Sequence, residues 1–155
     1  MDRILQTYQG VGELRLTNQK QRITALQRVP VLSGLSRARL VELAHRAEEV
    51  EVPAGGYLTR QGALGNEVYV ILDGSFTVRR HARTIATRKK GDVFGELSLI
   101  DGLPRSANVV AEKDSTVLVV HKRDFEQLLE VPRIAKGVIR NLASRLRAAD
   151  ERLLG

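Results

Sequence analysis

The chain has 155 residues, a net charge of +7 and a hydrophobic share of 43%, which suffice for one globular domain with its own core. The sequence lacks cysteine, which excludes disulfides, iron–sulfur clusters and zinc–thiolate sites, and its three histidines are scattered without metal-ligand spacing. The basic balance favours an anionic partner, which could be nucleic acid, a membrane surface or a small phosphate.

The first part of the chain predicts an N-terminal arm and two helices. Residues 1–20 are weakly patterned and interrupted by Gly10 and Gly12, so they are assigned to the arm, and a single domain is expected over residues 21–155. A short helix is predicted over residues 21–29, with Pro30 ending it. Ser36 is a suitable N-cap for a second helix, whose apolar stripe is Leu40, Leu43, Ala44 and Ala47.

The middle of the chain, about residues 48–120, predicts short strands with glycine turns. Eight of the thirteen glycines lie between Gly55 and Gly102. Apolar residues alternate over residues 68–72 as far as an Asp73-Gly74 turn, and the alternation continues at Phe76 and Val78 on a return strand. Further strands are expected at 84–87, 109–111 and 116–120, the last two forming a pair around Lys113-Asp114. This pattern indicates an antiparallel, jelly-roll-like β-roll.

Helical patterns return at about residues 121–153. A first helix over residues 121–130 is broken by Val131-Pro132, and Pro132 suits the first turn of a longer helix over residues 133–153. Its apolar residues recur at steps of three and four and could serve as core or as a dimer seam. The predicted fold class is therefore α+β, with a glycine-rich β-roll between N-terminal and C-terminal helices.

Two basic clusters lie in the β region, at residues 79–83 and 88–90. We interpret them as two solvated strands of a hairpin in preference to a binding patch. A DNA-binding role for this cluster is the weaker alternative.

Residues 94–109 combine the acid Glu96, the base Arg105 and two hydroxyls with glycines and a proline. Gly95 lets a ligand approach the main chain, and Arg105 has the planar fork that suits two phosphate oxygens. Glu96 would repel a phosphate but can accept a hydrogen bond from a sugar hydroxyl. The segment thus fits a nucleotide whose phosphate and ribose lie close together, although a purely structural Glu96–Arg105 ion pair is the plain alternative.

These residues resemble the phosphate-binding cassette of cyclic nucleotide-binding domains, of the type found in cAMP receptor proteins and protein kinase A regulatory subunits. The likeness rests on Phe94-Gly95-Glu96-Leu97-Ser98-Leu99 followed by Arg105-Ser106-Ala107-Asn108-Val109. It extends over about residues 25–150, through Val52-Pro53-Ala54-Gly55-Gly56, Tyr69-Val70-Ile71-Leu72-Asp73-Gly74 and Asp124-Phe125.

The resemblance implies roles for individual residues. Glu96 would accept a hydrogen bond from the ribose 2′-hydroxyl, Arg105 would pair with the cyclic phosphate, and Ser106 would donate to a phosphate oxygen. The backbone amides of Gly95, Leu97, Ser98 and Ala107 would complete the cradle. The last helix would close over the purine, with Asn141, Arg140 and Arg145 as the candidates for its capping residue.

The function implied is a non-enzymatic receptor in signal transduction, with cAMP expected in preference to cGMP and no further cofactor, catalytic residue or metal. Ligand binding would move the C-terminal helices, and a homodimer through the last helix is possible. The alternatives are a cAMP-receptor-type DNA-binding regulator truncated before its helix-turn-helix, and a regulatory fragment of a larger enzyme or channel. Met1 suggests a natural start, whereas Gly155 could be a fragment boundary.

No apolar run is long enough for a membrane span and Met1-Asp2-Arg3 does not open a signal peptide, so a cytoplasmic location is expected.

Overall fold

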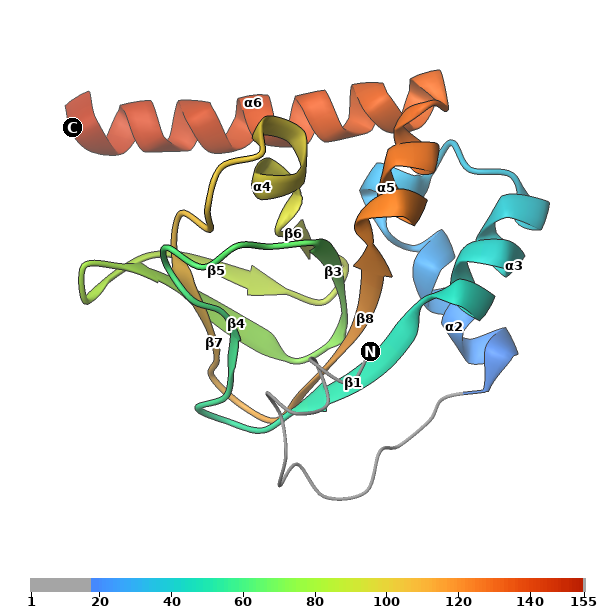
Figure 1. The fold of residues 1–155 in the computed structure, drawn as a ribbon, viewed down its shortest axis with the longest axis horizontal. Coiled ribbons are helices and arrows are strands. Elements are labelled where there is room, and N and C mark those ends of the chain that lie inside the picture. Colours follow the sequence, from blue (N-terminus) through green and yellow to red (C-terminus); the bar gives the residue numbers. More distant parts are fainter. Residues whose placement is uncertain (1–17, 155) are drawn as a thin grey trace.

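The protein is described here by a computed structural model, in which residues 18–154 are placed. Helices at the two ends of this range flank two four-stranded antiparallel sheets (Figure 1). This confirms the predicted α+β class and the β-roll between helices. Most of the predicted N-terminal arm lies outside the described residues.

The N-terminal helical layer consists of α2 (Gln19–Gln27), the 3-10 turn η1 (Pro30–Leu32) and α3 (Arg37–Arg46). Helix α2 starts two residues before the predicted 21–29 segment, because the Asn18 side chain caps it and Gln21 bonds back to the Asn18 backbone in a capping box. It ends at Gln27, since Pro30 opens a separate turn. Ser36 caps α3 as predicted, accepting from the Arg39 backbone N–H.

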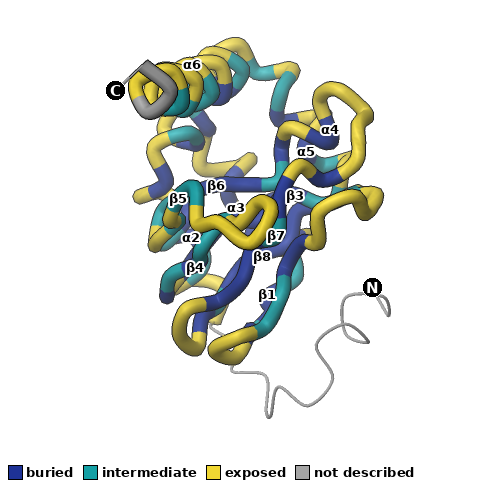
Figure 2. Tube along the Cα trace, turned by 90° about the vertical axis from the view of Figure 1, so that its left-hand side faces the viewer, coloured by how far each residue is buried: buried dark blue, intermediate teal, exposed yellow. Residues whose placement is uncertain are grey.

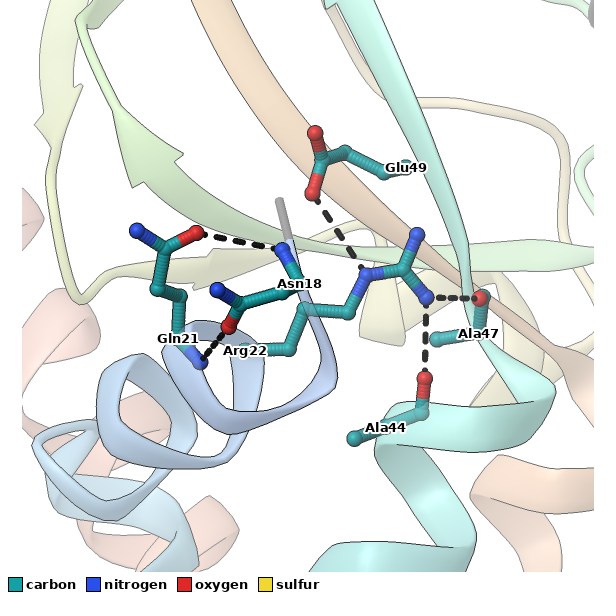
Figure 3. A network of polar contacts seen from close by, with 6 residues as sticks. All are labelled: Asn18, Gln21, Arg22, Ala44, Ala47 and Glu49. Carbon is teal, nitrogen blue, oxygen red and sulfur yellow. Dashed lines mark hydrogen bonds and ion pairs between the residues drawn. The ribbon is translucent and has the colours of Figure 1, made fainter. Parts of the chain in front are cut away.

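A buried ion pair fixes this layer to the first strand, β1 (Glu48–Val52) (Figure 3). Arg22 Nε lies 3.5 Å from Glu49 Oε1, and the side chains are 13% and 1% exposed. Arg22 Nη1 also donates to the carbonyls of Ala44 and Ala47 at 3.0 and 3.3 Å. Arg22 therefore connects α2, the end of α3 and β1 through one guanidinium group.

The strands form two sheets. One has the order β1-β8-β3-β6 and the other β2-β7-β4-β5. The remaining strands are β2 (Tyr57–Thr59), β3 (Glu67–Asp73), β4 (Ser75–Arg80), β5 (Arg83–Lys89), β6 (Val93–Phe94), β7 (Asn108–Ala111) and β8 (Ser115–His121). The basic clusters do lie on the β4–β5 hairpin, as predicted.

Two predicted strand pairs are wrong. The Asp73-Gly74 turn does not join a hairpin, because β3 and β4 belong to different sheets. Likewise β7 and β8 leave the 112–114 turn for opposite sheets instead of pairing with each other. Gly74 has φ +100°, and a Cβ there would overlap with Ser115, so this turn is a crowded corner between the sheets.

Alternation along the strands divides the core in two. Tyr69 and Ile71 of β3 point between the sheets, where Tyr69 stacks on Phe94 with ring centroids 5.0 Å apart. Val68 and Val70 point to the opposite face and pack against the helices. Strands β3 and β8 are accordingly among the most buried parts of the chain (Figure 2).

The C-terminal helices are α5 (Lys122–Leu129) and α6 (Pro132–Leu154), close to their predicted bounds. In the first half of α6, Ile134 is part of the helical core, and Val138 is also buried. The second half extends over the β-roll beside α4 (Glu96–Asp101) (Figure 1), and Leu146 there is 63% exposed. None of the described helices is both long enough and apolar enough to cross a membrane.

Candidate functional site

The predicted cassette starts at the end of β6 and turns into the short helix α4. Gly95 precedes the helix with φ +93° and Gly102 follows it with φ +71°, conformations that glycine adopts without a steric penalty. The Gly102 N–H donates to the Ser98 carbonyl and closes the helix at 3.0 Å. The two glycines thus set the bounds of the short helix α4.

A hollow of about 550 Å³ lies between this segment, the β4–β5 hairpin and the second half of α6. All seven residues predicted to bind ligand line it, namely Gly95, Glu96, Leu97, Ser98, Arg105, Ser106 and Ala107. Its size is within the usual range for small-molecule sites. The structure therefore brings the predicted residues together around one space.

Glu96 is buried, at 2% exposed, although it is charged. Its Oε1 accepts from Arg145 Nη1 at 2.6 Å, and Arg145 Nη2 also donates to the Val93 carbonyl. The other oxygen, Glu96 Oε2, is buried without a hydrogen-bond partner. A buried carboxylate oxygen with no donor is costly, so the site has an acceptor to offer to a ligand hydroxyl.

Arg105 is 6% exposed and held from two sides. Its Nη1 donates to the Gly95 carbonyl and its Nη2 to the Glu67 carbonyl, both at 2.7 Å, and the Glu67 carboxylate lies 3.9 Å away. These contacts fix the plane of the guanidinium group and leave some of its five N–H donors for an anion.

Two glycines make room for this arginine. A Cβ on Gly65 would overlap with the Arg105 guanidinium group, and a Cβ on Gly95 would come within 2.9 Å of its Nη1. Gly65 is a residue that sequence reasoning missed, because its role is visible only once residues 65 and 105 lie side by side.

Glu96 and Arg105 do not form the structural ion pair that the sequence left open. Glu96 pairs with Arg145, and Arg105 lies against Glu67. Each therefore has its own supporting partner.

The three candidates for the purine cap are separated. Arg145 lines the hollow at the cassette, whereas Arg140 and Asn141 line a second hollow beside the first half of α6. Five residues turn the helix by about 140°, which directs Arg140 away from Arg145, whereas Asn141 lies on nearly the same face as Arg145 but about 6 Å nearer the start of the helix.

The solvated interpretation of the basic hairpin is only partly right. Arg79, Arg83, Lys89 and Lys90 are not part of the cassette hollow, but Arg80 and Arg88 line it, and Arg80 Nε donates to the Ser106 carbonyl at 2.9 Å. In the sequence, the two basic clusters were the feature that could have indicated a place for Arg80 and Arg88 in the site. Apolar residues of α6 that also line the hollow are Leu142, Leu146 and Ala149.

Comparison with known proteins agrees with this geometry. The profile of the cyclic nucleotide-binding domain matches residues 49–131, which is more than half of the chain and includes the whole cassette. The chain belongs to the cyclic nucleotide-binding domain family. This makes it a cyclic nucleotide-binding regulatory domain with the β-roll fold of that family.

Individual proteins that are similar to this chain agree with this family assignment. A cAMP-dependent protein kinase regulatory subunit of Schizosaccharomyces pombe is 36% identical over 105 residues, covering 67% of this chain and 26% of the relative. The catabolite activator protein of Thermus thermophilus has a TM-score of 0.70 at 32% identity, covering 80% of this chain and 61% of the other. A cAMP-bound PfPKA-R structure, at 24% identity and TM-score 0.79, shares the fold over 86% of this chain and 46% of the other. The chain spans about a quarter of the length of the first curated relatives it matches.

Proposed function

We propose that this domain is a non-enzymatic receptor for a cyclic nucleotide, cAMP in preference to cGMP, bound in the cassette and coupled to the position of helix α6. The observation that carries the proposal is the buried Glu96 carboxylate, whose Oε2 lacks a partner inside the hollow. A ribose 2′-hydroxyl supplies the missing donor without adding negative charge next to the carboxylate.

The phosphate is assigned to Arg105. The Arg105 guanidinium is held in place by the Gly95 and Glu67 carbonyls, so little conformational freedom is lost when it binds an anion. Ser106, next in the chain, lines the same hollow and can donate its hydroxyl to a phosphate oxygen or to the base. Arg80 and Arg88 add positive charge to the walls, which favours an anionic ligand.

Coupling to α6 is assigned to Arg145. The same carboxylate that offers Oε2 to the ribose holds Arg145 through Oε1 at 2.6 Å. Leu142, Leu146 and Ala149 follow the same helix along the hollow. A ligand that contacts both the cassette and these residues favours one position of α6 over others, which is the condition for a conformational response.

Isothermal titration calorimetry with cAMP and cGMP tests the proposal. Arg105→Ala should weaken cAMP binding by about 1.5–3 kcal/mol, or roughly 10–100-fold, because a charge-assisted bond to the phosphate is lost. Glu96→Gln keeps the shape of the side chain and should weaken binding through the ribose hydroxyl.

Arg83→Ala is the matched control, because Arg83 is exposed on the β4–β5 hairpin and outside the hollow. It removes the same charge from the chain and should leave affinity nearly unchanged. Equal affinities of wild type and the Arg105 variant would overturn the assignment of Arg105, and tighter binding of cGMP would overturn the preference for cAMP.

Self-association through α6 is a further part of the proposal. Ile139 and Leu146 are 64% and 63% exposed and lie two turns apart on the helix. Sedimentation with and without cAMP tests whether this apolar surface pairs with a second copy. A monomer under both conditions, at concentrations well above those used for binding, would contradict it.

A further inference from the structure

A second hollow, of about 650 Å³, lies away from the cassette where α6 joins the helical layer. It has three walls. These are the segment around η1, the turn between β5 and β6, and the first half of α6, and they contribute Pro30, Val31, Ser33, Gly34, Gly91, Asp92, Val93, Arg133, Lys136, Gly137, Arg140 and Asn141.

The wall formed by α6 is strongly basic. Arg133, Lys136 and Arg140 follow one another at steps of three and four residues, so they lie on one face of the helix and span about 10 Å along it. Within the described residues, none of the three makes an ion pair with an acid.

Acidic side chains do little to balance these charges. Asp92 is the acid among the residues that line the hollow, and its Oδ2 already accepts from the Lys89 backbone N–H at 2.8 Å. In α6 itself the first acid is Asp150, ten residues beyond Arg140. Like charges at these spacings repel, and among the described residues no acidic side chain forms an ion pair with any of the three.

Close packing at the base of the hollow fixes the position of the helix. A Cβ on Gly34 would lie 2.5 Å from Arg133 Cβ, and a Cβ on Gly137 would lie 3.2 Å from the Val31 carbonyl oxygen. The two glycines let α6 approach the η1 segment closely. The basic side chains therefore project from a well-supported wall.

We propose that this hollow binds a small molecule with two or more phosphate groups. Two arginine forks and one lysine ammonium match several phosphate oxygens, and their 10 Å span suits charges spread over more than one phosphate. A three-walled concave site favours a small molecule over an acidic peptide, since protein partners need larger and flatter surfaces. Asn141 supplies a polar side chain at the same wall.

Titration calorimetry with inorganic tripolyphosphate, at about 0.15 M salt and in the presence of excess cAMP, tests the proposal. The Arg133→Gln/Arg140→Gln double variant should bind at least about 10-fold more weakly, because two charge-assisted contacts are removed. Both side chains are exposed, so the fold should persist, which circular dichroism checks. Arg147→Gln, an exposed position on the same helix outside both hollows, is the matched control and should bind like wild type.

Several results would overturn the proposal. These are no binding of tripolyphosphate, equal weakening by Arg147→Gln, displacement of tripolyphosphate by cAMP, and tighter binding of a hexaglutamate peptide than of tripolyphosphate. The test does not depend on the cassette. If cAMP does not bind at all, the proposed function fails, while the comparison of the double variant with Arg147→Gln still decides the second site.

Discussion

Two buried glutamate–arginine pairs connect helices to the β-roll, and they differ in the kind of polar atom that is left without a hydrogen-bond partner. Arg22 of α2 meets Glu49 of β1, and Arg145 of α6 meets Glu96 at the start of α4. Both arginines also donate to backbone carbonyls, and both carboxylates are at most 2% exposed. In the first pair the buried atom without a hydrogen-bond partner is a donor, Arg22 Nε, whereas in the second it is an acceptor, Glu96 Oε2.

This difference separates a structural contact from a binding site. The Arg22–Glu49 pair is enclosed by protein and fixes the helical layer (Figure 3). The Glu96–Arg145 pair borders a hollow and offers an acceptor to it. The first pair should therefore control stability and the second ligand binding.

The largest effect is expected from Arg22→Ala. Removing Arg22 leaves Glu49 buried without its cation, so the free energy of unfolding should fall by about 3 kcal/mol. Urea denaturation measures this, with Lys20→Ala, an exposed position on the same helix, as the control. The cAMP affinity of the folded variant should stay close to that of wild type. A loss of affinity as large as that of Glu96→Gln would contradict the division between the two pairs.

A smaller effect is expected from Gly65→Ala. The added methyl group would overlap with the Arg105 guanidinium and displace it from the hollow. Binding of cAMP should weaken by about 1.5 kcal/mol, or roughly 10-fold, with much less change in stability. Gly55→Ala is the control, because it strains a residue at φ +85° that lies outside the hollow and meets nothing within 4 Å. Unchanged affinity in Gly65→Ala would show that Arg105 need not hold this position.

The smallest effect is expected from Leu146→Ala. Leu146 is 63% exposed yet lines the hollow, so a bound base should cover part of it. Losing that contact should cost about 1 kcal/mol, or roughly 5-fold in cAMP affinity. Ile139→Ala is the matched control, since Ile139 is 64% exposed and lies outside the hollow. Equal effects of the two substitutions in calorimetry would argue against a base contact at Leu146.

The sequence predicted those parts of the molecule that depend on neighbours along the chain. The cap at Ser36, the bounds of α6 and the seven cassette residues are local patterns, and all appear where they were expected. The binding roles of the cassette residues stay predictions until ligand is measured.

Contacts between residues that are far apart in the chain could not be predicted from local sequence patterns. Asp73-Gly74 looks like a hairpin turn, but a turn between two sheets uses the same residues, so the pairing of β3 with β4 was wrong. Arg145 was one of three equivalent candidates because its partner Glu96 is 49 residues away. Nothing in the local sequence distinguishes it from Arg140, which the helix directs into the other hollow.

The central claim is that the Glu96 carboxylate links ligand binding to α6 through Arg145, and amide hydrogen exchange with and without cAMP tests it most directly. Wild type and the Arg147→Gln control should both gain protection over residues 142–149 on binding. Arg145→Gln should bind cAMP, as calorimetry checks, but lose most of that gain. A ligand-induced gain in Arg145→Gln equal to that of wild type would contradict the claim.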